Sequence, residues 1–337
     1  MTSTPSARRW PGLFAAALAF AGLAISSGAA AQTPARVPAK CDRACLEALV
    51  NSYLDAVVAH DPARLPLSAD VKYTENEQLL AVGDGFWHTA TARGNYAHYF
   101  ADPVAGQAAW MGTMREGAVL LLMSLRLRVE LGRITEIETG YFRPGGGGPN
   151  DIAAMDARGK PEPLWLEPIP AAQRATRAEL VEVANAYFEG VQRNDGKGFY
   201  PFTDDCDRIE NGAHTTNTPS GRPTPGGFDY MGLDCKKQLE SGYLAIVTSV
   251  HHRRFPLVDE ERGVVWSNGV FDMGGTVREI KLTSGETVDM KAFAGRAASI
   301  QLAEAFRIEN GKIRRVEMIG PSAPYHLNSP WGGLSGR

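Results

Sequence analysis

The sequence lacks the features of several large protein classes. It has no basic tract, and 38 acidic residues outnumber 35 lysines and arginines, which disfavours a nucleic-acid partner. No G-x-S-x-G, H-E-x-x-H, Walker or G-x-G-x-x-G context occurs, which disfavours hydrolase triads, zinc proteases and nucleotide chemistry. After residue 31 no stretch is long and apolar enough to cross a bilayer. We therefore expect no cofactor, and no membrane partner once residues 1–31 are removed.

Cysteine is scarce, with four residues in the whole chain. Cys41 and Cys45 lie in one half, and Cys206 and Cys235 in the other, an even number that suits disulfides in an oxidising compartment. We expect pairing within each half, although three connectivities are open. A bond from Cys206 to Cys235 would contribute roughly 3 kcal/mol to the free energy of unfolding. A metal site is the rival interpretation, but no C-x-x-C pair or suitably spaced histidine occurs, so we predict no metal.

The N-terminal residues 1–31 have the order of a cleavable signal peptide. Arg8 and Arg9 precede an apolar run at 13–25, and small residues follow up to Ala31. An uncleaved anchor is the alternative, and the paired arginines leave the general secretory and twin-arginine routes both open. We predict a periplasmic or secreted protein.

The remaining chain contains an internal repeat. Residues 50–55 (VNSYLD) match 184–189 (ANAYFE), and residues 127–134 (LRVELGRI) match 306–313 (FRIENGKI), in the same order. Each copy opens with an amphipathic helix, and the second begins with a capping box formed by Thr176 and Glu179. Each copy closes with a predicted hairpin, at 120–142 and 303–319, which turns at a glycine. Helices followed by strands predict an α+β fold.

Two irregular segments separate or interrupt these copies. Residues 143–160 are rich in glycine and proline and poor in apolar residues, which predicts a linker. Residues 212–234 have no counterpart of similar length in the first copy, and loops this long are often functional.

These features resemble the nuclear transport factor 2-like superfamily, which includes ketosteroid isomerase, scytalone dehydratase and SnoaL-like polyketide cyclases. The resemblance rests on the opening helix, residues 67–75 (LSADVKYTE) and the strand, glycine and strand unit at 307–317. Residues 73–76 (YTEN), the connector at 165–177 and the pattern of Cys206, 208–210 (RIE) and Cys235 look like a secreted two-copy group with largely unassigned function. The resemblance implies tandem cone-shaped domains at 41–143 and 171–326, each with N-terminal helices on a curved antiparallel sheet. Residues 144–170 would then form the linker and 327–337 a tail.

The resemblance also implies a candidate general base in the first copy. Glu75 falls where ketosteroid isomerase carries its catalytic carboxylate, and strand alternation places Tyr73 on the same face. An apolar wall would raise the pKa of this carboxyl group and suit it to take a proton at neutral pH. We predict Glu75, Tyr73 and His88 as catalytic residues. The alternative is that Glu75 only accepts hydrogen bonds at a strand end, and that the aromatic residues are core.

The second copy places Glu210 at the matching position, with Arg208 in place of Tyr73. A neighbouring guanidinium favours the ionised carboxylate, which suits an ion pair or an anion clamp. We therefore expect chemistry in the first copy and binding in the second, although the reverse assignment is open. The residues that we expect to bind substrate in the two copies are Tyr53, Asn76, Trp87, Tyr96, Arg208, Glu210, Asn211, His214 and His251.

Two functions fit these features. The first is an exported cofactor-independent lyase, dehydratase or isomerase that acts on a small hydrophobic or aromatic molecule by carboxylate general-base catalysis. The second is a non-catalytic pocket protein that binds a hydrophobic ligand or a protein partner, and the sheet faces would also permit a homodimer.

Overall fold

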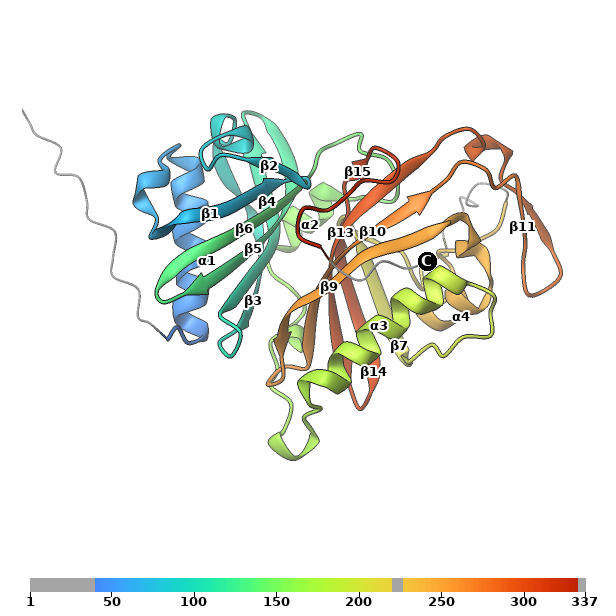
Figure 1. Ribbon diagram of the computed structural model, residues 1–337. Helices are drawn as coiled ribbons and strands as arrows, with labels where there is room; N and C mark the ends of the chain where they lie inside the picture. Colours follow the sequence, from blue (N-terminus) through green and yellow to red (C-terminus); the bar gives the residue numbers. More distant parts are fainter. Residues whose placement is uncertain (1–39, 220–226, 333–337) are drawn as a thin grey trace, which may run out of the picture. The chain divides into compact units, whose positions relative to one another are not determined.

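Each half of the chain folds as one long helix against one large sheet, as the computed structural model shows (Figure 1). The structure describes residues 40–219 and 227–332, so the predicted signal peptide lies outside the described residues. Within these two ranges no helix has the length and hydrophobicity of a membrane span. The described residues belong to one compact unit.

The first half begins with α1 (Arg43–Val58), followed by a six-stranded sheet in the order β2-β1-β6-β5-β4-β3. The Asp42 side chain caps α1 by accepting the Cys45 amide at 2.9 Å. The buried face of the helix follows the predicted spacing and includes Leu46, Tyr53 and Val57. The strands are β1 (Leu67–Glu75), β2 (Gln78–Leu80), β3 (Ala92–Asp102), β4 (Gln107–Glu116), β5 (Val119–Glu130) and β6 (Arg133–Phe142).

The second half repeats this plan around α3 (Arg177–Arg193). Its main sheet has the order β8-β7-β14-β13-β10-β9, and β15 pairs with β13. The predicted capping box is present, because Thr176 and Glu179 each accept the other's backbone amide. The strands of this sheet are β7 (Phe202–Glu210), β8 (Ala213–His214), β9 (Ser249–Asp259), β10 (Val264–Met273), β13 (Ala298–Glu309), β14 (Lys312–Ile319) and β15 (Ser322–Ala323). Outside it lie α4 (Cys235–Glu240) and a small hairpin of β11 (Glu279–Lys281) and β12 (Thr287–Asp289).

Both predicted hairpins are present at the ends of the two sheets. The turn residues Leu131 and Gly132 have φ of 49° and 75°, and Asn310 and Gly311 have φ of 51° and 71°. Two successive positive φ values match the twist of antiparallel strands, which is why glycine and asparagine occur there. The sheets are mixed, however, and not purely antiparallel as expected: β1 runs parallel to β6, and β7 parallel to β14.

The outer faces of the two sheets share one buried apolar cluster. It brings Phe100 and Met111 of the first sheet together with Leu257 and Trp266 of the second. The rings of Phe100 and Trp266 lie 5.3 Å apart. Each sheet therefore has one face toward its own helix and another face in this shared cluster.

Two segments expected to be irregular are ordered and packed. The predicted linker contains α2 (Ile152–Arg158), where Asp156 accepts a hydrogen bond from Thr113 on β4. The expected tail is packed as far as residue 332: the Trp331 indole donates to Thr74 at 2.9 Å, and the Ser329 hydroxyl donates to Glu77 at 2.8 Å. Composition missed both because their partners lie far away in the sequence.

Both cysteine pairs form disulfides within their own halves, as predicted. Cys41 bonds to Cys45 at the start of α1, and Cys206 bonds to Cys235 between β7 and α4. The second bond fixes α4 beside β7, and this contact shapes the site described next.

Candidate functional site

The interior of the first half is filled by aromatic side chains. Tyr73, Phe86, Trp87, Trp110 and Tyr141 are each at most 2% exposed and belong to one core cluster. The rings of Phe86 and Tyr141 lie 4.3 Å apart. These aromatic side chains pack against one another beside β1.

Glu75, the predicted base, is held by two hydrogen bonds in this filled interior. Its Oε2 accepts the Phe86 amide at 2.7 Å and the Tyr73 hydroxyl at 3.1 Å. The first bond anchors the short 3₁₀ helix η2 (Gly85–His88) beside β1. Gly85 has φ of 66°, and a Cβ there would collide with the Glu75 carboxylate, so the sequence needs glycine at this contact. Glu75 thus accepts two hydrogen bonds at the end of β1, and its catalytic role stays a prediction.

Of the other residues predicted in the first half, Tyr53 lies near Glu75. Burial, and next the neighbouring Tyr73 and Glu75, raise the pKa of Tyr53 well above its ordinary value. The remaining predicted side chains have other partners. His88 is exposed on the surface, with Nε2 3.4 Å from Asp84. Asn76 accepts the Tyr141 amide at 2.8 Å, which fixes the turn after β1. Tyr96 points to the outer face, where its hydroxyl donates to Glu317 at 2.6 Å. Tyr53 and Trp87 pack edge to face in the core, with their ring centres 5.4 Å apart.

The second half contains a cavity of about 600 Å³ at the corresponding place. Its walls come from α3, β7, β10, β13 and β14, and from the segments that carry Tyr230, Tyr243 and Phe293. Most of the lining is apolar, as in many small-molecule sites. The lining residues are Gly148, Pro149, Tyr187, Arg208, Glu210, Thr215, Tyr230, Met231, Tyr243, Leu244, Ile246, Val247, Phe271, Met273, Met290, Phe293, Ile300, Leu302, Glu304 and Met318.

Two bulky side chains of the first half correspond to small residues in the second. Trp110 faces Leu125 across β4 and β5, and at the matching pair of strands Ser267 faces Glu304. On the next strand, Tyr141 of the first half corresponds to Gly320 of the second. A Cβ at Gly320 would meet Met318 and Ile300, which line the cavity. Serine and glycine thus stand where the first half uses tryptophan and tyrosine.

The buried Arg208 and the half-buried Glu210 form an ion pair on one wall. The Arg208 Nε lies 2.9 Å from Glu210 Oε1, and the same guanidinium also bonds to Thr215, Tyr230 and Gln238. Burial alone would lower the pKa of Arg208, but the Glu210 carboxylate raises it well above its ordinary value. Arg208 is therefore a fixed positive charge. Gln238 reaches it from α4, the helix that the Cys206–Cys235 disulfide holds in place.

Glu304 lies on β13 and is the second carboxyl group of the cavity. It is 1% exposed, and its Oε2 has no hydrogen-bond partner. Burial, and next the negative charge of Glu210, raise its pKa to about 8, whereas Arg208 and the Tyr187 phenol act in the opposite direction. A carboxyl group with such a pKa holds a proton at pH 7 and can still exchange it.

The sequence prediction missed Glu304, although the repeat contained a signal for it. The alignment of 127–134 with 306–313 sets Leu125 opposite Glu304, so an acid replaces a core leucine. The strand around it is otherwise apolar at its inward positions, with Leu302 and Phe306 on either side. A lone inward acid in such a strand is a candidate functional residue.

The remaining predicted residues of the second half lie outside the cavity lining. Asn211 accepts the Gly320 amide at 2.9 Å and fixes a turn, as Asn76 does in the first half. His214 is on the surface, with Nδ1 2.8 Å from Asp207. His251 is on the outer face of the sheet, beside Asp272.

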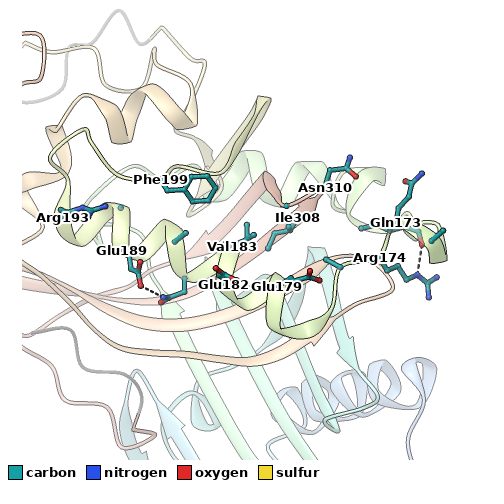
Figure 2. A pocket seen from close by; sticks show the side chains of 17 residues that line it. Gln173, Arg174, Glu179, Glu182, Val183, Glu189, Arg193, Phe199, Ile308 and Asn310 are labelled. Carbon is teal, nitrogen blue, oxygen red and sulfur yellow. Dashed lines mark hydrogen bonds between the residues drawn. The ribbon is translucent and has the colours of Figure 1, made fainter.

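A further groove of about 690 Å³ runs along the solvent side of α3 (Figure 2). Its polar side chains are exposed, and several already have local roles. Glu179 belongs to the capping box, and Glu189 accepts a hydrogen bond from Asn185 at 2.7 Å. No buried polar group points into this groove among the lining residues that the structure describes, so it is the weaker candidate.

Comparison with protein families finds a match over residues 173–320 to a domain of unknown function (DUF8021). The match begins just before α3 and ends just after β14, so it spans the half that contains the cavity. No curated protein is significantly similar to the chain.

Similar solved structures include proteins of the nuclear transport factor 2-like kind. A protein of unknown function from Cytophaga hutchinsonii, described as NTF2-like, is 14% identical, covering 29% of this chain and 90% of its own, with a TM-score of 0.24. A candidate polyketide cyclase from Silicibacter sp. tm1040 is 25% identical over 28% of this chain and 88% of its own, with a TM-score of 0.25. A candidate ketosteroid isomerase from Kribbella flavida is 16% identical over 37% and 90%, with a TM-score of 0.26. The names of these neighbours are of the kinds that the sequence resembles, and they assign no residue of this chain.

Proposed function

We propose that the second half holds the working site, and that the protein is a cofactor-independent isomerase or lyase acting on a small hydrophobic molecule. The observation that carries this proposal is the buried Glu304 carboxyl group, with one unpartnered oxygen, on the wall of an apolar cavity. This moves the chemistry from Glu75, which already has two partners, to the other copy.

The side chains around Glu304 support a proton-transfer reaction. The substrate body would pack against apolar residues such as Phe271 and Leu302. Glu304 would take a proton from carbon, or give one to it, because its pKa of about 8 lies close to neutral pH. The Tyr187 phenol and the fixed charge of Arg208 would stabilise negative charge that develops on a substrate oxygen.

A second function, ligand binding without chemistry, is supported by the ion pair of Arg208 and Glu210, whose bonds are already made within the protein. Arg208 already bonds to four neighbours, and Glu210 is tied to it, so this pair is a well-satisfied wall element. Under this function the cavity would store or carry a hydrophobic molecule, and Glu304 would only select a ligand with a polar group.

One experiment separates the two functions. The mature protein is mixed with 2-tetralone, a small bicyclic ketone, in D₂O, and exchange of its α-protons is followed by NMR. Binding is measured separately by displacement of the fluorescent probe anilinonaphthalene sulfonate. We expect saturable exchange that Glu304→Gln lowers by about 100-fold or more, while the probe is still displaced.

The matched control is Glu75→Gln, which removes a carboxylate from the filled half. We expect it to keep exchange within a few-fold of the original rate. Binding without exchange in the original protein would favour the storage function, and equal loss in both variants would contradict the assignment to the second half.

We also propose that residues 41–143 and 171–326 are two copies of one domain and that the chain is exported. The common strand order and the single parallel pair in each sheet support the first statement. The two disulfides support an oxidising compartment. Mass spectrometry of the protein recovered from the periplasm or the medium should give a chain that begins at Gln32, and recovery from the cytoplasm with residues 1–31 attached would contradict export.

A further inference from the structure

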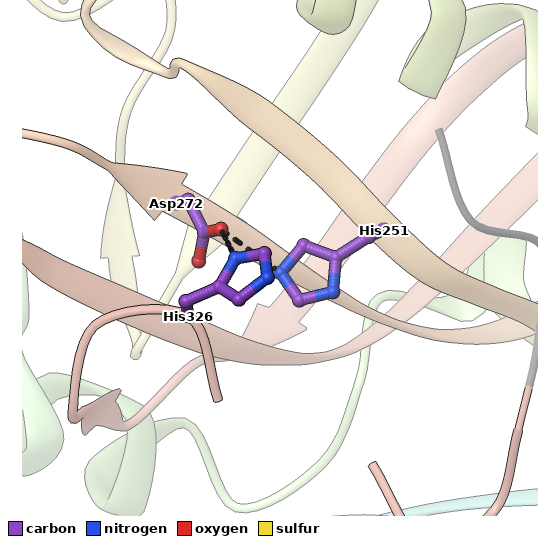
Figure 3. A group of neighbouring side chains, drawn as sticks. All are labelled: His251, Asp272 and His326. Atoms are coloured by element: carbon purple, nitrogen blue, oxygen red, sulfur yellow. Dashed lines mark hydrogen bonds and ion pairs between the residues drawn. The ribbon is translucent and has the colours of Figure 1, made fainter. Parts of the chain in front are cut away.

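Three potential metal ligands meet on the outer face of the second sheet (Figure 3). His251 comes from β9, Asp272 from β10 and His326 from the segment after β15. The neighbours of Asp272 on its strand, Phe271 and Met273, line the cavity, so strand alternation directs Asp272 to the opposite face. This cluster is separate from the proposed catalytic site.

The three ligating atoms converge on a small volume. The Nδ1 of His326 lies 2.8 Å from Asp272 Oδ2, and the Nε2 of His251 lies 3.1 Å from the same oxygen. One nitrogen or oxygen from each residue lies within 4.8 Å of the others. Zinc bonds of 2.0–2.2 Å in tetrahedral geometry place neighbouring ligands about 3.3 Å apart. The two separations from Asp272 Oδ2, 2.8 Å and 3.1 Å, are close to that value.

Neighbouring groups already orient the carboxylate. Ser299 donates its hydroxyl to Asp272 Oδ1, and the backbone amide of His326 donates to the same serine oxygen at 2.8 Å. Oδ2 is therefore the oxygen left to face the two imidazoles. Hydrogen bonds that orient a metal-binding side chain in this way are typical of protein metal sites.

His251 supplies an independent indication of a missing partner. Its side chain is buried, with the residue only 5% exposed, and its Nε2 lies 3.1 Å from Asp272 Oδ2 but in a geometry that does not meet hydrogen-bond criteria. A buried ring nitrogen whose hydrogen bond is poorly formed calls for an explanation. A bound cation would satisfy this nitrogen and the carboxylate together.

We propose that His251, Asp272 and His326 bind a divalent transition metal of the zinc class. Two imidazoles and one carboxylate suit such a metal, whereas magnesium and calcium prefer oxygen ligands. The His326 side chain is 70% exposed, so water completes the coordination on that side. Sequence reasoning missed the site because its ligands lie 21 and 54 residues apart, with no local spacing motif.

The position of His326 gives the site a structural role. The segment that follows it reaches the first sheet, where the Trp331 indole donates to Thr74 at 2.9 Å. A metal at His326 fastens this segment to β9 and β10 of the second sheet. The bound metal thereby links the last described residues to both sheets.

The test uses cobalt(II) as a visible probe on protein treated first with a chelator. We expect one cobalt ion per chain, with ligand-field absorption that zinc abolishes by displacement, and a rise in Tm when zinc is added. Asp272→Asn and His326→Ala should each weaken cobalt binding at least tenfold. Because His326 is exposed, its variant is expected to fold, which keeps the test valid if the buried Asp272 variant does not.

The matched control is His214→Ala. His214 also lies 2.8 Å from an aspartate oxygen, that of Asp207, but it belongs to no three-ligand group in the described part of the chain. We expect this variant to bind cobalt as the original protein does. Equal binding by the original protein and His326→Ala, or equal loss in His214→Ala, would overturn the proposal.

Discussion

Where the first half of the chain has Trp110, Leu125 and Tyr141, the second half has Ser267, Glu304 and Gly320. The strand order around these positions is the same in both halves. In the first half the three side chains belong to a buried core, and in the second Glu304 lines a cavity of about 600 Å³ while Gly320 lies beside two of its lining residues. The two halves thus share a strand order but differ in the bulk of their interior side chains.

The connections between matching strands also differ in length between the two halves. In the first half β4 passes to β5 through a short turn that contains Gly117. The matching strands β10 and β13 are separated by residues 274–297, which carry β11 and β12. This insertion supplies Met290 and Phe293 to the cavity wall. The half that contains the cavity therefore also has an inserted segment that forms part of the cavity wall.

The largest expected effect comes from emptying the filled half. Trp110→Ala removes a buried indole, so we expect the free energy of unfolding to fall by about 3–5 kcal/mol. Ser267→Ala, at the matching position, removes one hydroxyl that donates to the Glu304 carbonyl, and we expect a loss of about 1 kcal/mol. Urea unfolding of the two variants measures both values. Similar losses would show that the interiors are packed alike, contrary to the comparison.

Much of this architecture could be predicted from the sequence, because the signals for it are local. The capping box at Thr176, the turn at Asn310 and the apolar face of α1 each depend on residues within a few positions of one another. The cysteine pairing followed from their division between the two halves. The predicted repeat also located the strands that define both interiors.

The site could not be predicted in the same way, because its properties depend on volume and long-range contacts. Glu75 and Glu210 match in the alignment, yet Glu210 lines a cavity whereas Glu75 is bonded to Tyr73 and Phe86 of a packed core. That difference arises from Trp110 and Tyr141 on other strands, whose bulk fills the first interior. The family resemblance points to Glu75 and Glu210, whereas Glu304 stands out only as a difference between the two copies.

The second prediction compares the two disulfides. Cys206 and Cys235 are 29 residues apart, and Cys41 and Cys45 only 4. Replacing Cys206 and Cys235 by serine should lower the free energy of unfolding by about 3–4 kcal/mol, and replacing Cys41 and Cys45 by about 2 kcal/mol. The difference is expected because a bond that closes a longer loop restricts the unfolded chain more. Loss of the Cys206–Cys235 bond should also weaken binding of anilinonaphthalene sulfonate, since α4 carries the Gln238 side chain that bonds to Arg208. Equal unfolding losses in both variants would contradict this difference.

The third prediction concerns the pH dependence of stability. The pKa of Glu304 is raised to about 8 in the folded protein from an ordinary 4.5. Between these values the folded state keeps a proton that the unfolded chain has released, so stability falls as pH rises, by at most about 1.4 kcal/mol per pH unit. Below this window both states are protonated and the effect disappears.

The matched measurement is the free energy of unfolding of Glu304→Gln at pH 5, 6, 7 and 8. We expect the variant to lose less stability than the original protein as pH rises. Glu77, whose pKa is raised to about 7 chiefly by burial, titrates in both proteins, so the difference between the two slopes belongs to Glu304. Parallel slopes would mean that Glu304 is ionised or well solvated at neutral pH.

The smallest effect is expected at His88, and it bears on the same comparison. His88 follows the core residue Trp87, but its own side chain is 70% exposed and contacts only the surface residue Asp84, at 3.4 Å, among the described ion pairs. His88→Ala should therefore change the free energy of unfolding by no more than about 0.5 kcal/mol. It should also leave tetralone exchange unchanged, because η2 lies in the filled half. A large loss of exchange in this variant, with the fold intact, would return the chemistry to the first half and with it the role predicted for Glu75.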